Sequence, residues 1–292
     1  MTFRSGLVAL AGRPNVGKST LANALAGTQV AAVSPRPQTT RRRITAVVHG
    51  EGWQAVLLDL PGFQKPADAL TARMQTTVDD NLADCDAALF VLNATEPVGR
   101  GDRFIADRLR ASRLPVITVL NKIDRLSADG TAAAIARVAP LVAFLELHPV
   151  SARDGRGVDA LRADLPQLLR EGPRYFPEGM ATDQTEEELA AELIREAALL
   201  RLRQEVPHAL AVDVQEIEPA RHGLVVRAGI VVETESQKGI VVGRGGSRIR
   251  DIGSDARSAL GRLWGTEVHL DLTVRVRKRW RDDESMLTRL GL

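Results

Sequence analysis

The chain has 292 residues, a net charge of +2, and 44% hydrophobic and 26% charged residues. This composition is ordinary for a globular protein of about two domains, and no apolar stretch approaches the roughly 18 residues of a transmembrane helix. The single cysteine, Cys85, excludes an internal disulfide, fits a reducing cytoplasm and is expected to be a small core residue.

The first part of the chain alternates short apolar runs with helical patterns. The apolar runs, which predict strands, lie at 7–11, 55–58, 87–92, 116–120 and 148–150. The helical patterns lie near 18–27, 68–83, 101–112, 128–143 and 157–170. Such alternation predicts an α/β fold, with helices on both faces of a mostly parallel sheet and ligands at the carboxyl ends of its strands.

A phosphate-binding motif links the first predicted strand to the first predicted helix. Residues 12–20 read GRPNVGKST and contain the P-loop pattern, in which glycines let backbone N–H groups surround phosphates. Lys18 is expected to reach the β- and γ-phosphates, and the Ser19 hydroxyl to coordinate Mg²⁺. The strand–loop–helix context disfavours the alternative, a glycine-rich helix entry without a ligand. The residues expected to contact the nucleotide here are Gly12, Asn15, Val16, Gly17, Lys18, Ser19 and Thr20.

A second motif, DLPG at 59–62, follows the apolar run 55–58. Asp59 at the end of a buried strand is expected to hold Mg²⁺ directly or through water, and the Gly62 amide to sense the γ-phosphate. An ordinary turn would read similarly, so the motif gains its meaning from its position after the P-loop.

A third motif, NKID at 121–124, follows the run 116–120 and resembles the guanine-reading motif of the translation-factor-like GTPases. The resemblance implies that Asp124 accepts hydrogen bonds from the guanine N1 and N2 donors, a pair that adenine lacks. It also implies that Asn121 braces the loops and that the Lys122 stem packs on the base. The segment VSA at 150–152 would add Ser151 and Ala152, with the Ala152 amide on guanine O6.

The segment SPRPQTTRRRI at 34–44 lies where such GTPases carry their first switch. A threonine there completes Mg²⁺ coordination when the γ-phosphate is present. Thr39 and Thr40 both qualify; Thr40 is favoured because related GTPases place this threonine directly before an arginine. Lys18, Thr40 and Gly62 are therefore the expected catalytic residues. Arg41–Arg43 follow, for which a solvated face is favoured over an RNA contact.

The pattern breaks in a stretch rich in proline, glycine and polar residues. We therefore predict a GTPase domain at 1–172, a linker at 173–187 and a smaller α+β domain at 188–292. In the last domain, the predicted helices lie at 188–205, 235–242 and 247–263, and the predicted strands at 209–216, 223–234 and 267–277. Residues 237–281 hold 11 Lys/Arg and 4 Asp/Glu, a basic segment typical of nucleic-acid binding.

Residues 240–253, IVVGRGGSRIRDIG, resemble the core of a KH domain, in which a G-x-x-G loop joins two helices. Glycines at Gly243 and Gly246 let backbone approach phosphates, and the adjacent groove takes about four unpaired bases. A plain glycine turn is the alternative, which the basic surroundings and the preceding pair of strands disfavour. The residues expected to contact RNA are Lys238, Gly243, Arg244, Gly245, Gly246 and Arg248.

A P-loop GTPase followed by a KH domain resembles the Era family of bacterial ribosome-assembly GTPases. The resemblance covers essentially the whole chain and includes the switch segment, DLPGF, NKID, residues 235–253 and the tail RVRKRWRDDESMLTRLGL. Two departures, Leu60 in DLPG and Asn93 after the third strand, leave the assignment intact. A P-loop kinase or ATPase, and an RNA-binding protein with a degenerate nucleotide domain, remain as alternatives.

The resemblance implies a monomeric switch that uses GTP, GDP and Mg²⁺ and binds the 3′ end region of small-subunit ribosomal RNA during 30S maturation. It implies a cytoplasmic protein with peripheral association with the inner membrane surface. Phe63 follows DLPG where many GTPases carry a water-orienting glutamine. Related GTPases with an apolar residue there often recruit K⁺ through a P-loop asparagine, here Asn15. The alternative is that Asn15 only braces the loop.

Overall fold

The computed structural model describes residues 2–34, 36, 39–62, 67–141, 145–202, 206 and 209–292. They form two compact units, each considered by itself. The first unit comprises Met1–Val30, Thr40–Lys65 and Gln75–Asp183; the second comprises Ala31–Thr39, Pro66–Met74 and Gln184–Leu292. Among the residues that the structure describes, no helix is long and apolar enough to cross a membrane.

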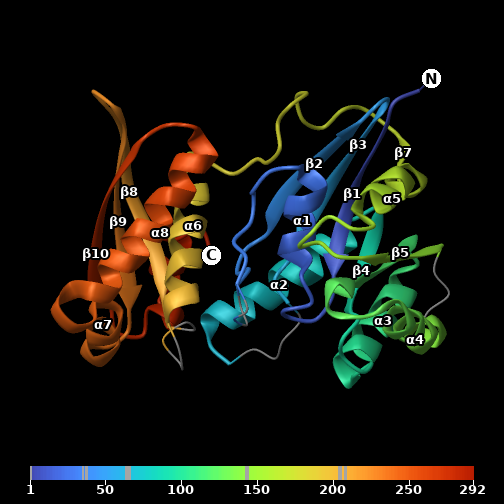
Figure 1. The fold of residues 1–292 in the computed structure, drawn as a ribbon, viewed down its shortest axis with the longest axis horizontal. Helices are drawn as coiled ribbons and strands as arrows, with labels where there is room; N and C mark the ends of the chain where they lie inside the picture. Colours follow the sequence, from blue (N-terminus) through green and yellow to red (C-terminus); the bar gives the residue numbers. More distant parts are fainter. Residues whose placement is uncertain are drawn as a thin grey trace. The chain divides into compact units, whose positions relative to one another are not determined.

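The first unit is built on a mostly parallel sheet with the order β2-β3-β1-β4-β5-β6, in which β7 pairs with β1 (Figure 1). The five predicted strands are present, each somewhat longer than expected. Two strands were not predicted: β2, which pairs antiparallel with β3, and the two-residue β7. The bounds are β1 Arg4–Ala11, β2 Ile44–Gly50, β3 Trp53–Asp59, β4 Ala87–Asn93, β5 Val116–Asn121, β6 Glu146–Val150 and β7 Arg170–Glu171.

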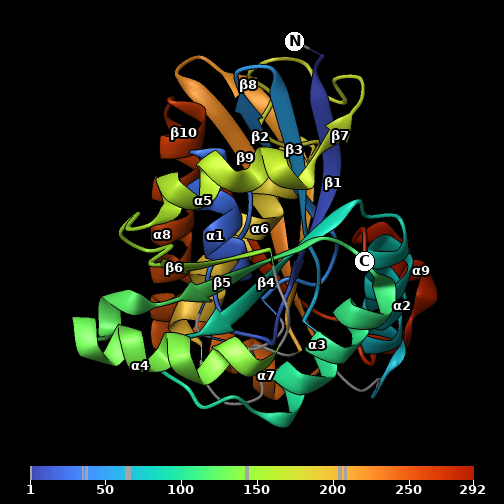
Figure 2. The ribbon, with the colours of Figure 1, turned by 90° about the vertical axis from the view of Figure 1, so that its right-hand side faces the viewer.

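Helices cover both faces of this sheet (Figure 2). One face packs α2, α3 and α4 against alternate strand residues such as Ala9, Val56 and Phe90. The intervening residues, such as Val8 and Leu10, point to the other face, where α1 and α5 pack against each other. The helices are α1 Lys18–Ala26, α2 Ala69–Ala83, α3 Arg100–Ser112, α4 Ala128–Val138 and α5 Val158–Asp164. The α/β prediction is confirmed, although α4 and α5 end earlier than predicted and continue as 3-10 turns.

Residues 173–183, which the sequence assigned to a linker, belong to the first unit. The fully buried Gln54 of β3 accepts hydrogen bonds from the Tyr175 and Phe176 amides and donates to the Phe176 carbonyl. The Val47 amide of β2 donates to the Ala181 carbonyl at 2.8 Å. These bonds hold the segment along the sheet up to the residue before the second unit begins.

The KH part of the second unit is a three-stranded sheet, β10-β9-β8, with α6 and α8 packed on one face (Figure 1). β8 runs antiparallel to β9, and β10 runs parallel to it. Helix α6 begins two residues inside the predicted linker, because Thr185 and Glu188 form a reciprocal capping box. The elements are α6 Glu186–Arg201, β8 Ala211–Ala220, β9 Gly223–Val232, α7 Glu235–Val242, α8 Ser247–Trp264, β10 Val268–Val276 and α9 Glu284–Arg289.

A second apolar cluster lies on the side of the KH sheet that α6 and α8 leave open. Trp280 is fully buried there, and its indole N–H donates to the Ala209 carbonyl at 2.8 Å. Leu70 and Met74, from the first turns of α2, pack with Trp280 and Leu287. The start of α2 therefore shares a core with the C-terminal tail.

Candidate functional site

The P-loop connects β1 to α1 and turns sharply through two close backbone approaches. Gly17 has φ 102°, and a β-carbon there would lie 2.3 Å from the Asn121 amide nitrogen. A β-carbon on Gly12 would lie 2.5 Å from the Val91 carbonyl oxygen. Both positions therefore require glycine, because a side chain would clash with neighbouring atoms. The absence of side chains also leaves the backbone amides accessible to phosphates. The buried Lys18 donates to the Gly12 carbonyl at 3.3 Å, and burial lowers the pKa of its amine although Asp59 opposes the shift.

Three oxygen-bearing side chains from separate elements meet beside this loop. The Ser19 hydroxyl lies 2.5 Å from Asp59 Oδ2 and 2.9 Å from the Thr40 hydroxyl. The Thr40 hydroxyl lies 3.2 Å from the same Asp59 oxygen. Hydroxyl and carboxylate oxygens at this separation are the ligand types that Mg²⁺ prefers. Thr39 makes different contacts, with the Ser34 hydroxyl at 3.0 Å and the Arg36 carbonyl at 2.7 Å, so the structure brings Thr40 to the cluster.

Gly62 approaches the P-loop closely. A β-carbon on Gly62 would lie 2.8 Å from Cγ of Pro14, so only glycine fits here without movement. The DLPG segment therefore ends against the loop that is expected to hold the phosphates, where its amide can face the γ-phosphate. Phe63, on which the prediction of K⁺ dependence rests, lies outside the described residues.

The NKID loop joins the P-loop to the end of β6 through Asn121. Its side-chain amide donates to the Val16 carbonyl at 2.9 Å, and its oxygen accepts from the Ala152 amide at 3.0 Å. The Lys122 amine donates to the Asn15 carbonyl at 2.5 Å, and Lys122 itself has φ 73°. Asn121 thus braces the loops as expected. The Ala152 amide, which was expected to contact guanine O6, already has Asn121 as its acceptor.

Asp124 is held in place by Ser151. The buried Ser151 hydroxyl donates to Asp124 Oδ1 at 3.1 Å. This orienting role is a contribution of Ser151 that the sequence motif alone does not specify, because 27 residues separate the two side chains. The two strand ends that carry them are adjacent, since β5 pairs with β6.

The three consecutive arginines after Thr40 differ in their surroundings. Arg41 is 3% exposed and Arg42 is half-buried, whereas Arg43 is exposed and lies 3.5 Å from Asp183. The expectation of a solvated face therefore holds only for Arg43. For Arg41 the expectation is wrong, because its side chain is buried.

The KH loop lies between α7 and α8 and contains three glycines with positive φ. Gly243 has φ 74° and ψ 172°, a region essentially restricted to glycine, and a β-carbon there would lie 2.8 Å from Cβ of Arg248. Gly245 and Gly246 have φ 58° and 75°, with nothing within 4 Å of an added β-carbon. The outer part of the loop is therefore open on its surface, as close approach of an RNA backbone requires.

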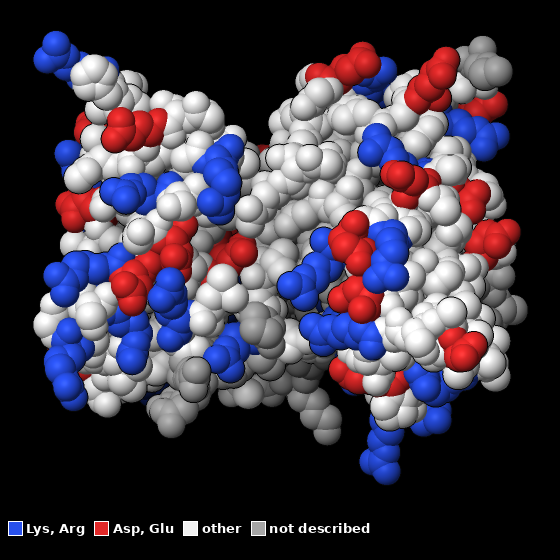
Figure 3. Space-filling model, viewed as in Figure 1, with Lys and Arg blue, Asp and Glu red and all other residues white. Residues whose placement is uncertain are grey.

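The basic residues around this loop divide into exposed and structural ones. Arg244 is exposed and Lys238 is half-buried. Arg248 is half-buried and donates to the Ile240 carbonyl at the end of α7, so it stabilises the helix end as well as adding charge. Arg250 was not predicted; it is exposed and reaches the Gly245 carbonyl at 3.1 Å. On the face shown in Figure 3, Lys and Arg gather around the α7 and α8 end of the KH part.

Comparisons with known proteins follow the same two parts of the chain. The family model described as a 50S ribosome-binding GTPase matches residues 7–122, and a KH domain model matches residues 205–281. GTPase Era of Mycolicibacterium paratuberculosis is 46% identical over 295 residues, 99% of each chain. GTPase Era of Mycobacterium tuberculosis is 45% identical over 296 residues, also 99% of each.

Two solved structures are similar over 99% of each chain at 36% identity. An Aquifex aeolicus Era variant bound to GDP and aluminium fluoride gives a TM-score of 0.93. Era in complex with MgGDPNP and nucleotides 1506–1542 of 16S ribosomal RNA gives a TM-score of 0.92. The likeness therefore extends over both units of the chain and over the positions of both candidate sites.

Proposed function

Because this chain belongs to the Era family of GTPases, we propose that it is a GTP-hydrolysing switch that binds the 3′ end region of small-subunit ribosomal RNA and assists 30S maturation. One observation carries the proposal: a full-length relationship joins a complete P-loop site to an open KH glycine loop in one chain. A P-loop kinase or ATPase would share the first feature but has no use for the NKID loop or the KH domain.

In the nucleotide site, the P-loop amides and Lys18 would bind the phosphates, and Ser19, Thr40 and Asp59 would hold Mg²⁺. Bound there, Mg²⁺ would supply positive charge to the β- and γ-phosphate oxygens. Thr40, which lies beside Ser19 and Asp59, would complete the coordination and so couple its segment to the nucleotide state. Asp124, oriented by Ser151, would select guanine.

The attacking water must be positioned without a side chain at the residue after DLPG, because that residue is Phe63, which cannot hydrogen-bond water through its side chain. We propose that K⁺ bound at Asn15 supplies charge between the phosphates, as an arginine finger does. Support comes from Asn15 itself, which has φ 63° and whose carbonyl is held by Lys122. This bond fixes the Asn15 backbone within the loop that is expected to hold the phosphates.

Turnover measured in KCl and in NaCl at equal ionic strength tests the K⁺ proposal. We expect faster turnover in KCl for the wild type, and no difference between the salts for Asn15→Ala. Equal rates in both salts for the wild type, together with an unchanged rate in Asn15→Ala, would mean that Asn15 only braces the loop.

In the RNA site, the exposed end of the KH loop would contact phosphates, and the adjacent groove would take unstacked bases. Phosphate contacts dominate affinity and make it depend on salt. Arg244 and Gly245 are both exposed, and Gly245 has open space where a side chain would point. Changing both to Asp therefore adds negative charge at the phosphate contact with little strain on the fold, because Asp tolerates positive φ better than most residues.

Titration of three RNAs with wild type and this double variant tests the RNA proposal: the single-stranded 3′ tail of small-subunit ribosomal RNA, its duplex form and a scrambled strand. We expect the tail to bind best, the double variant to bind it at least tenfold more weakly with a smaller salt slope, and GTP turnover to be unchanged. Equal binding of tail and duplex, or wild-type affinity in the double variant, would overturn the KH assignment.

By family resemblance, we also propose that the protein is a cytoplasmic monomer that associates with the 30S subunit and peripherally with the inner membrane surface. Co-sedimentation with 30S subunits and with membrane fractions, and the mass in solution, measure these points separately. The proposed RNA contact also includes four residues around the KH loop: Lys238, Gly243, Gly246 and Arg248.

A further inference from the structure

Arg13, the second residue of the P-loop, makes two ion pairs with residues far along the chain. Its Nε donates to Asp102 Oδ1 at 2.7 Å, and its Nη2 donates to Glu96 Oε2 at 2.8 Å. The Asp102 side chain is 2% exposed and that of Glu96 is 48% exposed. Burial by itself would lower the pKa of Arg13, but the hydrogen bonds and charges of Asp102 and Glu96 outweigh it and raise the pKa.

Both carboxylates are themselves fixed to regular elements. The second oxygen of Asp102 accepts from the Gly99 amide at 2.8 Å and so caps the start of α3. The second oxygen of Glu96 accepts from the side chain of Asn93, the last residue of β4, at 2.5 Å. The guanidinium therefore attaches the P-loop to the start of one helix and the end of one central strand.

The first turn of α3 passes close to the Arg13 side chain. Gly101 lies in the first turn of α3, and a β-carbon there would lie 2.8 Å from Cδ of Arg13 and 3.2 Å from its Cγ. The absence of a side chain at Gly101 is thus what allows the arginine stem to pass over the helix. Packing and polar contacts agree on one position for Arg13.

The opposite side of the P-loop is held by the NKID loop, through the Val16 and Asn15 carbonyls described above. Arg13 supplies the restraint on the near side. Its own carbonyl and that of Gly12 lie within 3.5 Å and 3.3 Å of the Lys18 amine. A loop fixed on both sides keeps its amides aligned for phosphates before the nucleotide arrives, which lowers the ordering cost of binding.

We propose that Arg13 is a positioning residue for nucleotide binding: its ion pairs with Asp102 and Glu96 hold the P-loop open and rigid, and its charge acts through the loop rather than on the nucleotide. This inference rests on the proposed nucleotide site, since it has meaning only if guanine nucleotide binds there. Asp102 is the informative partner, because it caps α3 and belongs to none of the motifs expected to contact the ligand.

A double-mutant cycle on the full chain tests the proposal, with dissociation of a fluorescent GDP analogue as the readout. Arg13→Gln and Asp102→Asn are each expected to raise the dissociation rate about tenfold, since charged hydrogen bonds are broken in both. The double variant is expected to match Arg13→Gln, because the change at Asp102 removes a contact already lost with the arginine. Arg103→Gln, an exposed arginine of the same helix, is the matched control and is expected to leave the rate unchanged.

Gly101→Ala gives a second approach that alters no charge. The new methyl group displaces Arg13, and the helix preference of alanine offsets part of the cost of leaving the buried Asp102 carboxylate without its partner. A raised dissociation rate measured well below the melting temperature of the variant supports positioning, because the chain is still folded there. Arg13→Lys, which keeps the charge but lacks the planar guanidinium fork, is expected to fall between wild type and Arg13→Gln.

Different results would contradict the nucleotide site and the positioning role of Arg13. If the wild-type chain does not bind the GDP analogue, the nucleotide site itself is wrong. If it binds, but Asp102→Asn and Gly101→Ala dissociate like wild type while Arg13→Gln does not, Arg13 acts directly on the nucleotide and the positioning role is overturned. Multiplicative effects in the double variant would likewise overturn it.

Discussion

At the scale of single residues, guanine selection is expected to depend on one carboxylate. Replacement Asp124→Asn exchanges a pair of acceptors for one acceptor and one donor, so the guanine N1 and N2 donors lose their partner while xanthine gains one. We expect GTP affinity to fall roughly 100-fold, the loss of two charge-assisted hydrogen bonds, and xanthosine triphosphate to bind better than GTP. Competition of both nucleotides against a fluorescent GDP analogue measures the change.

The matched control for this prediction is Asp129→Asn. Asp129 is an exposed residue in the first turn of α4, close in sequence to Asp124 but outside the nucleotide site. The Asp129→Asn variant should keep the wild-type preference for GTP. GTP binding that is unaltered in Asp124→Asn would contradict the role assigned to the NKID loop.

The single thiol illustrates what burial does to a titrating group. Cys85 is buried and donates to the Asn81 carbonyl at 3.1 Å. Burial, with the nearby charges of Asp86 and Asp84, raises its pKa from 9.0 to about 12. The native thiol is therefore protonated at neutral pH, which makes it a poor nucleophile, since the thiolate is the reactive form.

We expect Cys85 to resist a thiol reagent at pH 8 in the folded protein and to react rapidly once urea unfolds the chain. Because the folded pKa is raised, the stability contributed by this group is present below pH 9 and is lost as pH rises toward about 12. Between pH 8 and 10, the unfolding free energy of the wild type should therefore fall relative to that of Cys85→Ala as pH rises. Rapid labelling under native conditions would contradict burial of the thiol.

At the scale of elements, the KH loop depends on the glycine that ends α7. The backbone of Gly243 occupies a region that side chains avoid, and its missing β-carbon makes room for Arg248. Gly243→Ala should therefore destabilise the KH part by about 1–3 kcal/mol and displace the loop. Urea unfolding and RNA titration should both show the change.

Gly239→Ala provides the control within the same helix. Gly239 lies inside α7 at an exposed position with nothing near an added β-carbon. Alanine there should stabilise the helix by about 0.5–1 kcal/mol, the ordinary difference between the two residues in a helix interior. If both substitutions changed the unfolding free energy in the same direction, the conformational role assigned to Gly243 would be wrong.

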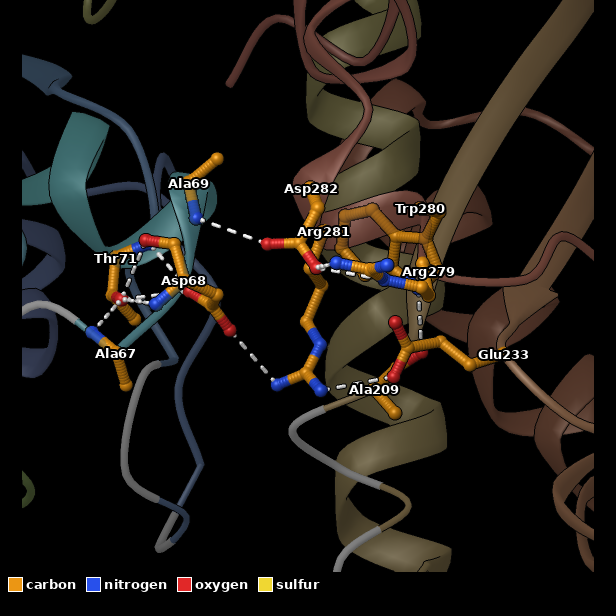
Figure 4. A network of polar contacts seen from close by, with 10 residues as sticks. All are labelled: Ala67, Asp68, Ala69, Thr71, Ala209, Glu233, Arg279, Trp280, Arg281 and Asp282. Atoms are coloured by element: carbon orange, nitrogen blue, oxygen red, sulfur yellow. Dashed lines mark hydrogen bonds and ion pairs between the residues drawn. The ribbon is translucent and has the colours of Figure 1, made fainter.

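At the scale of the whole molecule, a segment that follows the DLPG motif in sequence shares a core with the C-terminal tail. Arg281 lies 3.1 Å from Asp68 and 2.9 Å from Glu233, and the Ala69 amide lies 3.4 Å from an Asp282 oxygen (Figure 4). Leu70 is buried in one apolar cluster with Trp280 and Leu287. The KH-containing unit is therefore completed by residues from the first third of the chain.

Leu70→Ala tests this composition of the unit. Removing a buried leucine side chain should lower the stability of the KH-containing unit by about 2–5 kcal/mol, although Leu70 lies at the start of α2. Unfolding followed through Trp280 fluorescence, with the other tryptophans replaced, reports on that core. Leu200→Ala, at a leucine that is 53% exposed on α6, is the control and should have little effect.

The same observation bears on the proposed domains, 1–172 and 188–292. A fragment of residues 188–292 lacks Leu70 and Met74, so it should fold less stably than the same residues in the full chain. Comparing the Trp280 transition in fragment and full chain measures the difference. Equal stability would mean that the boundary drawn from the sequence describes a self-sufficient domain.

The sequence by itself predicted the family and located both candidate sites, because the P-loop, DLPG, NKID and the KH glycine loop are local motifs of a few neighbouring residues. It also determined the α/β class, since buried parallel strands are continuous apolar runs. It missed β2, an edge strand over 44–50 whose apolar run 46–48 was not recognised as a strand. It also missed the start of α6, although Thr185 and Glu188 carry the capping signal.

Tertiary structure alone decided contacts between residues distant in the chain. Thr40 rather than Thr39 meets Ser19 and Asp59, Ser151 orients Asp124, and Arg13 reaches Asp102, 89 residues away. No local pattern encodes such pairings, because they depend on which strand ends become neighbours when the sheet assembles. The physical reason is general: motifs record what the backbone must do locally, whereas burial and ion pairing are set by packing between elements.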